Sequence, residues 1–164
     1  MKELVNKADS FLGGLFKGAP KMPDSSKESL VKAWPWIAVI FGVLQLMVAK
    51  GLWDVVRLFD KVNSVFGAWL GTAYVYGGKD KFFVYLSLIT LVVDAVILLM
   101  AFPKLQKRAK AGWDLVFLGA LLNVLYSVFN FFVYGRGMGD FLSALIGSTI
   151  GFYLLYQVKD KYKS

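Results

Sequence analysis

The chain has 164 residues, of which 57% are hydrophobic and 18% are charged. A soluble domain of this size has roughly 45–50% apolar and 25% charged residues, so the composition indicates a membrane protein. The sequence contains no cysteine and no histidine. Disulfides, thiolate catalysis and cysteine metal sites are therefore excluded, and the commonest general base and metal ligand is missing. We expect no metal site and no cofactor. The net charge is +8, but the basic residues flank apolar blocks, where they suit anionic lipid headgroups. We therefore expect no nucleic-acid partner.

Residues 1–24 are predicted to form an amphipathic surface helix and a linker. Apolar residues recur at helical spacing over residues 1–17, without the continuous apolar core of a signal peptide. We expect this helix to lie on the membrane surface, the alternative being a helix packed on the rest of the protein. Residues 18–26 contain two prolines and predict a linker. Ser25 and Glu28 then have the spacing of a capping box, which predicts the start of the next helix.

Residues 25–164 are predicted to form an all-α, four-span membrane domain with the helices packed as a bundle. A span needs about 20 residues, with about 17 as the lower limit. The four segments that meet this requirement are residues 33–49, 82–102, 115–134 and 141–158. Residues 50–81 begin with charges opposite an apolar stripe, which predicts an interfacial helix outside the membrane. Their glycine-rich second half, residues 62–78, is left open between a fifth span, a re-entrant piece and an interfacial segment.

The distribution of positive charge predicts the orientation. With four spans, 13 lysines and arginines lie on the side of the two termini and 6 lie on the opposite side. The positive-inside rule then places both termini in the cytoplasm, and we expect the bacterial cytoplasmic membrane. The basic loop between the second and third spans is predicted to contact anionic lipids through Lys104, Lys107, Arg108 and Lys110.

One carboxylate, Asp94, lies near the middle of a predicted span. Counted along the helices, Asp94 and Asn123 share a depth of about 13 Å from the cytoplasmic ends. Other polar residues follow the same inward stripes, because residues three and four apart share one helix face. The predicted intramembrane polar cluster comprises Asp94, Asn123, Gln45, Thr90, Ser127 and Asn130. Small residues on the same stripes, which allow close approach of helices, are predicted at Gly147, Gly151 and Gly42.

No lysine or arginine lies within the spans, so Asp94 has no ion-pair partner there. Because an apolar environment disfavours the charged form of a carboxyl, we expect Asp94 to keep its proton and to bond to Asn123 or Gln45. Two roles remain open. Asp94 joins helices by an interhelical hydrogen bond, or it is a proton or cation site on a wet path through the membrane.

A third hypothesis comes from Gly137-Met138-Gly139-Asp140, which resembles the Gly-x-Gly-Asp signature of intramembrane aspartyl proteases. The resemblance implies Asp140 and Asp94 as a catalytic pair. An aspartyl dyad needs adjacent carboxylates, whereas the two residues are predicted to differ in depth by about 14 Å. The alternative is a glycine turn with Asp140 as the helix N-cap.

The stretches AWPWIAVIFGVL, LLMAFPKLQKRAKAGWDLVF and LIGSTIGFYLLYQVKDKY resemble a family of small, uncharacterised four-span bacterial membrane proteins. The resemblance covers the four spans and implies no activity. We therefore expect a non-enzymatic scaffold or accessory subunit that binds other membrane helices. The alternatives are a small oligomeric channel or proton-coupled transport unit using Asp94, and, more remotely, the protease.

Overall fold

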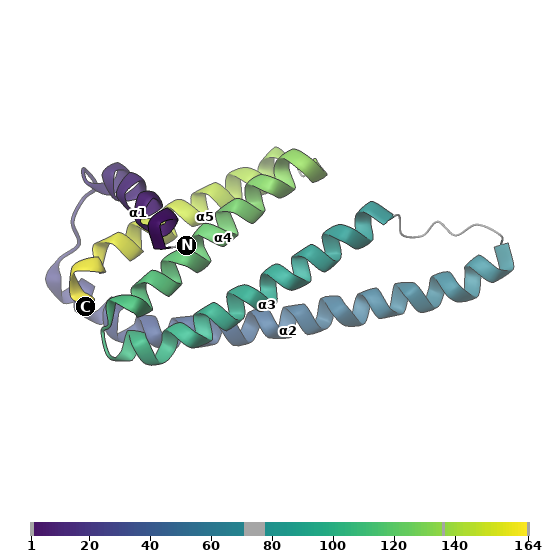
Figure 1. Cartoon of the computed structure of the whole chain (residues 1–164), viewed down its shortest axis with the longest axis horizontal. Coiled ribbons are helices and arrows are strands. Elements are labelled where there is room, and N and C mark those ends of the chain that lie inside the picture. The colour runs from purple at the N-terminus through teal and green to yellow at the C-terminus, as the bar shows by residue number, and fades with distance from the viewer. Residues whose placement is uncertain (1, 71–77, 136, 164) are drawn as a thin grey trace. The chain divides into compact units, whose positions relative to one another are not determined.

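The computed structural model describes residues 2–70, 78–135 and 137–163, and the part of the chain that it describes is all-α. Five α-helices follow one another along the chain (Figure 1). They are α1 (Lys2–Phe16), α2 (Asp24–Leu70), α3 (Gly78–Gln106), α4 (Lys110–Phe129) and α5 (Met138–Gln157). A π-helical turn, η1 (Asn130–Tyr134), extends α4, and a 3-10 turn, η2 (Lys159–Lys161), follows α5.

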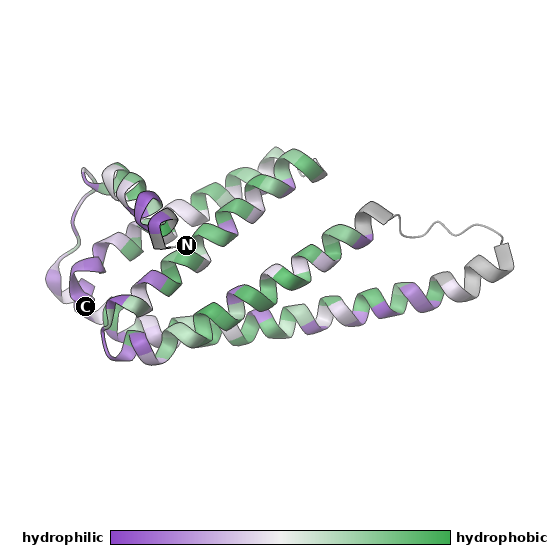
Figure 2. Cartoon of the chain, in the orientation of Figure 1, coloured by the Kyte–Doolittle hydropathy of each residue, from purple (hydrophilic) through white to green (hydrophobic). Residues whose placement is uncertain are grey.

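Four of these helices are long and apolar enough to cross a membrane. Their apolar segments contain the four predicted spans (Figure 2). The helices divide between two compact units, which are described separately. Unit 1 comprises Met1–Ile40 and Ile97–Ser164, and unit 2 comprises Phe41–Val96.

Unit 1 is a helical bundle built from α1, the start of α2, the end of α3, α4 and α5. Its core is centred on Trp113 and Phe117 of α4, whose rings stack with centroids 5.0 Å apart. The indole Nε1 of Trp113 donates a hydrogen bond of 2.9 Å to the carbonyl oxygen of Leu155 on α5. A buried indole N–H needs such a partner, so this bond sets how α4 and α5 pack together.

Helix α1 packs on the other helices of unit 1. This packing was the alternative to the predicted helix on the membrane surface. Val5, Ala8, Leu12 and Phe16 lie against the core, and the ring of Phe16 stacks on Tyr156 of α5. Apolar residues Phe11 and Leu15 stay exposed on the same helix. The apolar surface of α1 therefore has two parts, one buried in the protein and one available to lipid.

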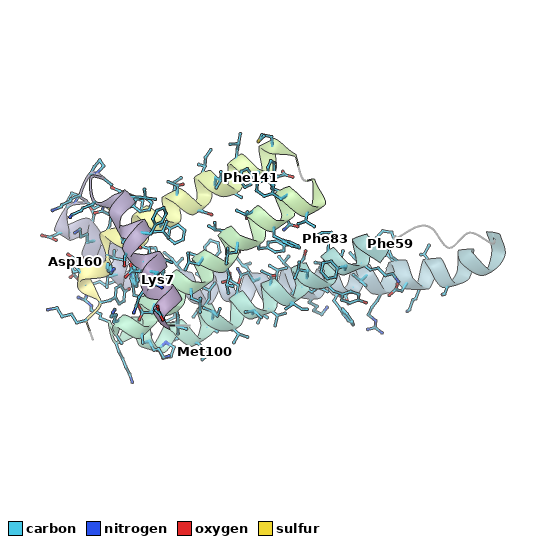
Figure 3. All side chains as sticks on the ribbon, turned by 45° about the horizontal axis from the view of Figure 1, so that its top comes forward. Lys7, Phe59, Phe83, Met100, Phe141 and Asp160 are labelled. Atoms are coloured by element: carbon cyan, nitrogen blue, oxygen red, sulfur yellow. The ribbon has the colours of Figure 1, made fainter. Side chains whose placement is uncertain are left out.

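Unit 2 is formed by α2 from Phe41 onward and by α3 up to Val96, and both helices carry exposed apolar side chains. Figure 3 draws the side chains of both helices. On α2, Gly42, Ala49 and Val56 are buried, which continues the predicted stripe of small and polar residues. Phe83 of α3 is also buried in this unit.

Helix α2 continues without a break from the first predicted span through Lys50 to Leu70, so the predicted interfacial helix is part of the same helix. Its place outside the membrane stays a prediction. The stripe that begins at Gly42 keeps its spacing of three and four through Leu52 and Val56, so the helical period is not interrupted. Gly51 alone costs only about 1 kcal/mol in a helix, which is too little to end it. A helix of 47 residues is about 70 Å long, more than twice the thickness of a bilayer core. The sequence left the structure of residues 62–78 open, and residues 71–77 of this segment lie outside the described residues.

Two predicted helix starts are also corrected. Helix α5 begins after Gly137, which is its N-cap, and Asp140 lies in the first turn. The preceding Gly135 has a φ of 68°, a left-handed conformation that glycine adopts without strain. At the start of α2, the carboxylate of Glu28 binds Arg108, so it does not serve the predicted capping box.

Candidate functional site

The buried carboxyl of Asp94 is the central feature of unit 2. The residue is 3% exposed, and its Oδ2 accepts a hydrogen bond of 2.7 Å from Nε2 of Gln45. Gln45 lies on the inward stripe of α2 and Asp94 on α3, so the bond joins the two helices. Gln45 is one of the two partners expected from the sequence, and a bond to the other, Asn123, stays a prediction.

The side-chain oxygen of Gln45 lies in a different situation from the nitrogen. Its Oε1 is buried and has no hydrogen-bond partner among the described residues. A buried acceptor without a donor is costly, by about 1–3 kcal/mol. Within the described residues, the side-chain amide of Gln45 is therefore satisfied at Nε2 and not at Oε1.

The remaining residues of the predicted polar cluster each donate a hydrogen bond of 2.8–3.0 Å to the backbone carbonyl oxygen four residues earlier. These residues are Thr90, Asn123, Ser127 and Asn130. Such a bond satisfies one donor of a polar side chain inside an apolar segment. Within unit 1, Ser127 and Asn130 line a small pocket of about 80 Å³ together with Asp140.

The predicted helix-packing glycines differ in their surroundings. Gly42 is buried in unit 2. A Cβ added at Gly147 or at Gly151 would meet no heavy atom within 4 Å in the described part of the chain. The predicted close contact at these two positions thus stays a prediction for a contact with another molecule.

The four basic residues predicted to contact lipid are in two different situations. Arg108 forms a bidentate ion pair with Glu28, with N–O distances of 2.8 and 3.2 Å. Its φ of 52° places it in the tight turn between α3 and α4. Lys104 and Lys110 line a groove of unit 1, and Lys107 is exposed nearby. Arg108 therefore has a structural role that the sequence did not indicate.

A second set of polar contacts that the sequence did not indicate ties the linker to the end of α5. The side chain of Gln157 accepts a hydrogen bond from the N–H of Met22 and donates one to the carbonyl of Pro20, at 2.9 and 2.8 Å. Lys159 binds both carboxylate oxygens of Asp9 at 2.7 Å. The only signal in the sequence was an uncharged polar residue, Gln157, at the end of an apolar span. These contacts fix α1 and the linker on unit 1.

Near Arg108, the C-terminal segment returns to the turn between α3 and α4. The N–H of Lys163 donates to the carbonyl oxygen of Arg108, and the N–H of Lys110 donates to that of Lys163. The phenol of Tyr162 is buried beside this turn, and burial raises its pKa to about 12.

Comparison of the chain with models of protein families, with curated proteins and with solved structures finds no match. The fold alone defines the class: the chain is a small multi-span helical membrane protein. The resemblance to the uncharacterised four-span family stays a prediction.

Proposed function

We propose that this chain is a non-enzymatic scaffold or accessory subunit of a membrane complex, located in a bacterial cytoplasmic membrane with both termini in the cytoplasm. The observation that carries the proposal is the bond between Gln45 and Asp94. It gives the buried acid a structural task, since an interhelical hydrogen bond stabilises a helix pair in lipid by about 0.5–2 kcal/mol. The backbone bonds of Thr90 and Asn130 support the same interpretation.

The outward stripe on α5 supports contact with another membrane protein. Gly147 and Gly151 are four residues apart and leave space for the backbone of a neighbouring helix. In lipid, where the hydrophobic effect does not drive helix association, such close approach supplies the packing energy.

The mass of the intact complex in mild detergent tests this proposal. We expect native mass spectrometry to find the chain in a stable complex with a different protein. A homo-oligomer would favour the second candidate function, a channel or proton-coupled transport unit using the buried Asp94, since intramembrane acids mark such sites. A monomer would contradict both.

The doubly substituted Gly147→Leu/Gly151→Leu variant is expected to lose the partner while its own thermal stability stays the same or rises. Leucine has better helix propensity than glycine, and a Cβ at either position meets no described atom within 4 Å. Gly51→Leu is the matched control, because a Cβ at Gly51 also meets nothing within 4 Å and this glycine lies on α2, not on the stripe of α5. Loss of stability in the double variant, or retention of the partner mass, would refute the contact.

The orientation is tested by single cysteines at Lys107 and Gly137 in intact cells. We expect an impermeant thiol reagent to label the cysteine at Gly137 and not the one at Lys107, because the basic loop is predicted to be cytoplasmic. Labelling after the cells are opened controls for access to both positions. Labelling at Lys107 in intact cells would reverse the topology.

A further inference from the structure

A groove of about 460 Å³ lies in unit 1 where α1, the end of α3 and the start of α4 meet. Val5 and Asn6 of α1 form one side, and Lys104 of α3 forms another. Helix α4 contributes Lys110 at its first residue and Leu115 and Leu118 farther along. The volume is in the range of pockets that hold a small ligand, about 300–1,000 Å³.

The end of the groove nearest the turn between α3 and α4 is positively charged. Within the described residues, Lys104 and Lys110 form no ion pair, in contrast to Arg108, which is bound to Glu28. Helix α4 begins here, and its N-cap residue Ala109 provides no side-chain hydrogen bond to the first turn. The positive end of the helix dipole therefore adds to the attraction for an anion.

The rest of the groove is apolar and follows α4 into its membrane-spanning segment. Leu115 and Leu118 are one and two turns beyond Lys110, and Val5 faces the same groove from α1. Asp114 also lines it and places one carboxylate beside the two lysines. The order along the groove, cationic then apolar, matches an amphiphile with an anionic headgroup and a hydrocarbon chain.

We propose that this groove binds one anionic glycerophospholipid. The phosphate lies between the ammonium groups of Lys104 and Lys110, and a hydroxyl of the headgroup donates to the carboxylate of Asp114. One acyl chain lies along Leu115 and Leu118 beside α1. The packing of Val5 on unit 1, which the sequence left open, is what gives the groove its second side.

Native mass spectrometry of the full chain in detergent, titrated with phosphatidylglycerol, tests the site. We expect one tightly bound lipid, with phosphatidylcholine of the same chain length binding at least tenfold more weakly. The Lys104→Gln/Lys110→Gln variant is expected to bind phosphatidylglycerol about 30-fold more weakly, since each basic residue near an anionic lipid contributes a factor of about five. Lys17→Gln/Lys163→Gln removes the same charge from exposed positions outside the groove and is expected to bind normally.

Circular dichroism of the lipid-free variants checks that the fold is intact. If the double variant unfolds, the single Lys110→Gln variant takes its place in the test, because the side chain of Lys110 is exposed. We expect it to bind phosphatidylglycerol about fivefold more weakly. Equal losses in the Lys17 and Lys163 control would mean general surface attraction and overturn the proposal. Binding of inorganic phosphate or of deacylated glycerophosphoglycerol as tightly as the intact lipid would overturn it as well, because the acyl chain would then contribute nothing.

Discussion

Replacing Gly112 by alanine is expected to lower the free energy of unfolding by roughly 1–3 kcal/mol, the usual cost of overpacking a core. A Cβ at this position would lie 2.7 Å from the backbone nitrogen of Leu105 and 2.9 Å from the carbonyl carbon of Lys104. Both are backbone atoms, so neither can move aside as a side chain would. Thermal unfolding in detergent, followed by circular dichroism, measures the effect.

Gly14→Ala is the matched control for this substitution. Gly14 is also helical, and a Cβ there meets nothing within 4 Å. Because alanine is the better helix former, we expect this variant to be as stable as the parent or up to about 1 kcal/mol more stable. If Gly112→Ala behaved like Gly14→Ala, the close approach of α4 to the end of α3 would not exist in the protein.

Gly112 also shows why a sequence reveals the spans more readily than their packing. The spans follow from runs of apolar residues, a local property. Helices α2 to α5, together with the π-helical turn η1 after α4, cover the four expected segments to within one residue. The need for glycine at position 112 comes from a contact with Leu105 across the tight turn at Arg108. Nothing in the local stretch AGWD distinguishes this glycine from one that merely ends a helix.

The same distinction applies to α1 and to the continuation of α2. The amphipathic pattern correctly predicted that α1 is a helix, but it could not tell whether protein or lipid covers the apolar face. The deciding contacts, Lys159 with Asp9 and Gln157 with the linker, join residues more than 130 positions apart. For α2, the charges after Lys50 suggested a new element, whereas the structure continues one helix to Leu70, which the uninterrupted helical spacing of the stripe allows.

Within the candidate site, the sequence predicted Asp94 and Gln45 as inward residues because each lies on a polar stripe of its own helix. It also suggested Asn123 as a partner, from its depth and its helix face. The structure shows the bond of Asp94 with Gln45, and it shows Asn123 donating to the carbonyl of Gly119 on its own helix. Depth and helix face therefore select candidates for a bond, and the expected bond between Asp94 and Asn123 stays a prediction.

Asp94→Leu is expected to destabilise the protein by roughly 1–3 kcal/mol, because it leaves the buried amide of Gln45 without its partner. Asp94→Asn retains a donor and an acceptor in nearly the same volume, so we expect it to remain close to the parent in thermal stability. The double variant Gln45→Leu/Asp94→Leu is expected to recover part of the loss, since removing both polar partners from an apolar site is less costly than removing one. Thermal unfolding of the three variants in detergent makes this comparison.

The carboxyl stretch of Asp94 in the infrared spectrum, identified by its loss in Asp94→Asn, reports directly on the charge. The expectation drawn from the sequence, that Asp94 keeps its proton in an apolar segment, predicts the band of a protonated acid. An ionised carboxylate band would mean that water or a cation reaches this depth. Proton flux into liposomes then separates the two proposed functions. If the protein is a scaffold, neither the parent nor the Asp94→Asn variant conducts protons. A transport unit conducts with Asp94 and stops with Asp94→Asn while its thermal stability is unchanged, and that result would replace the scaffold proposal.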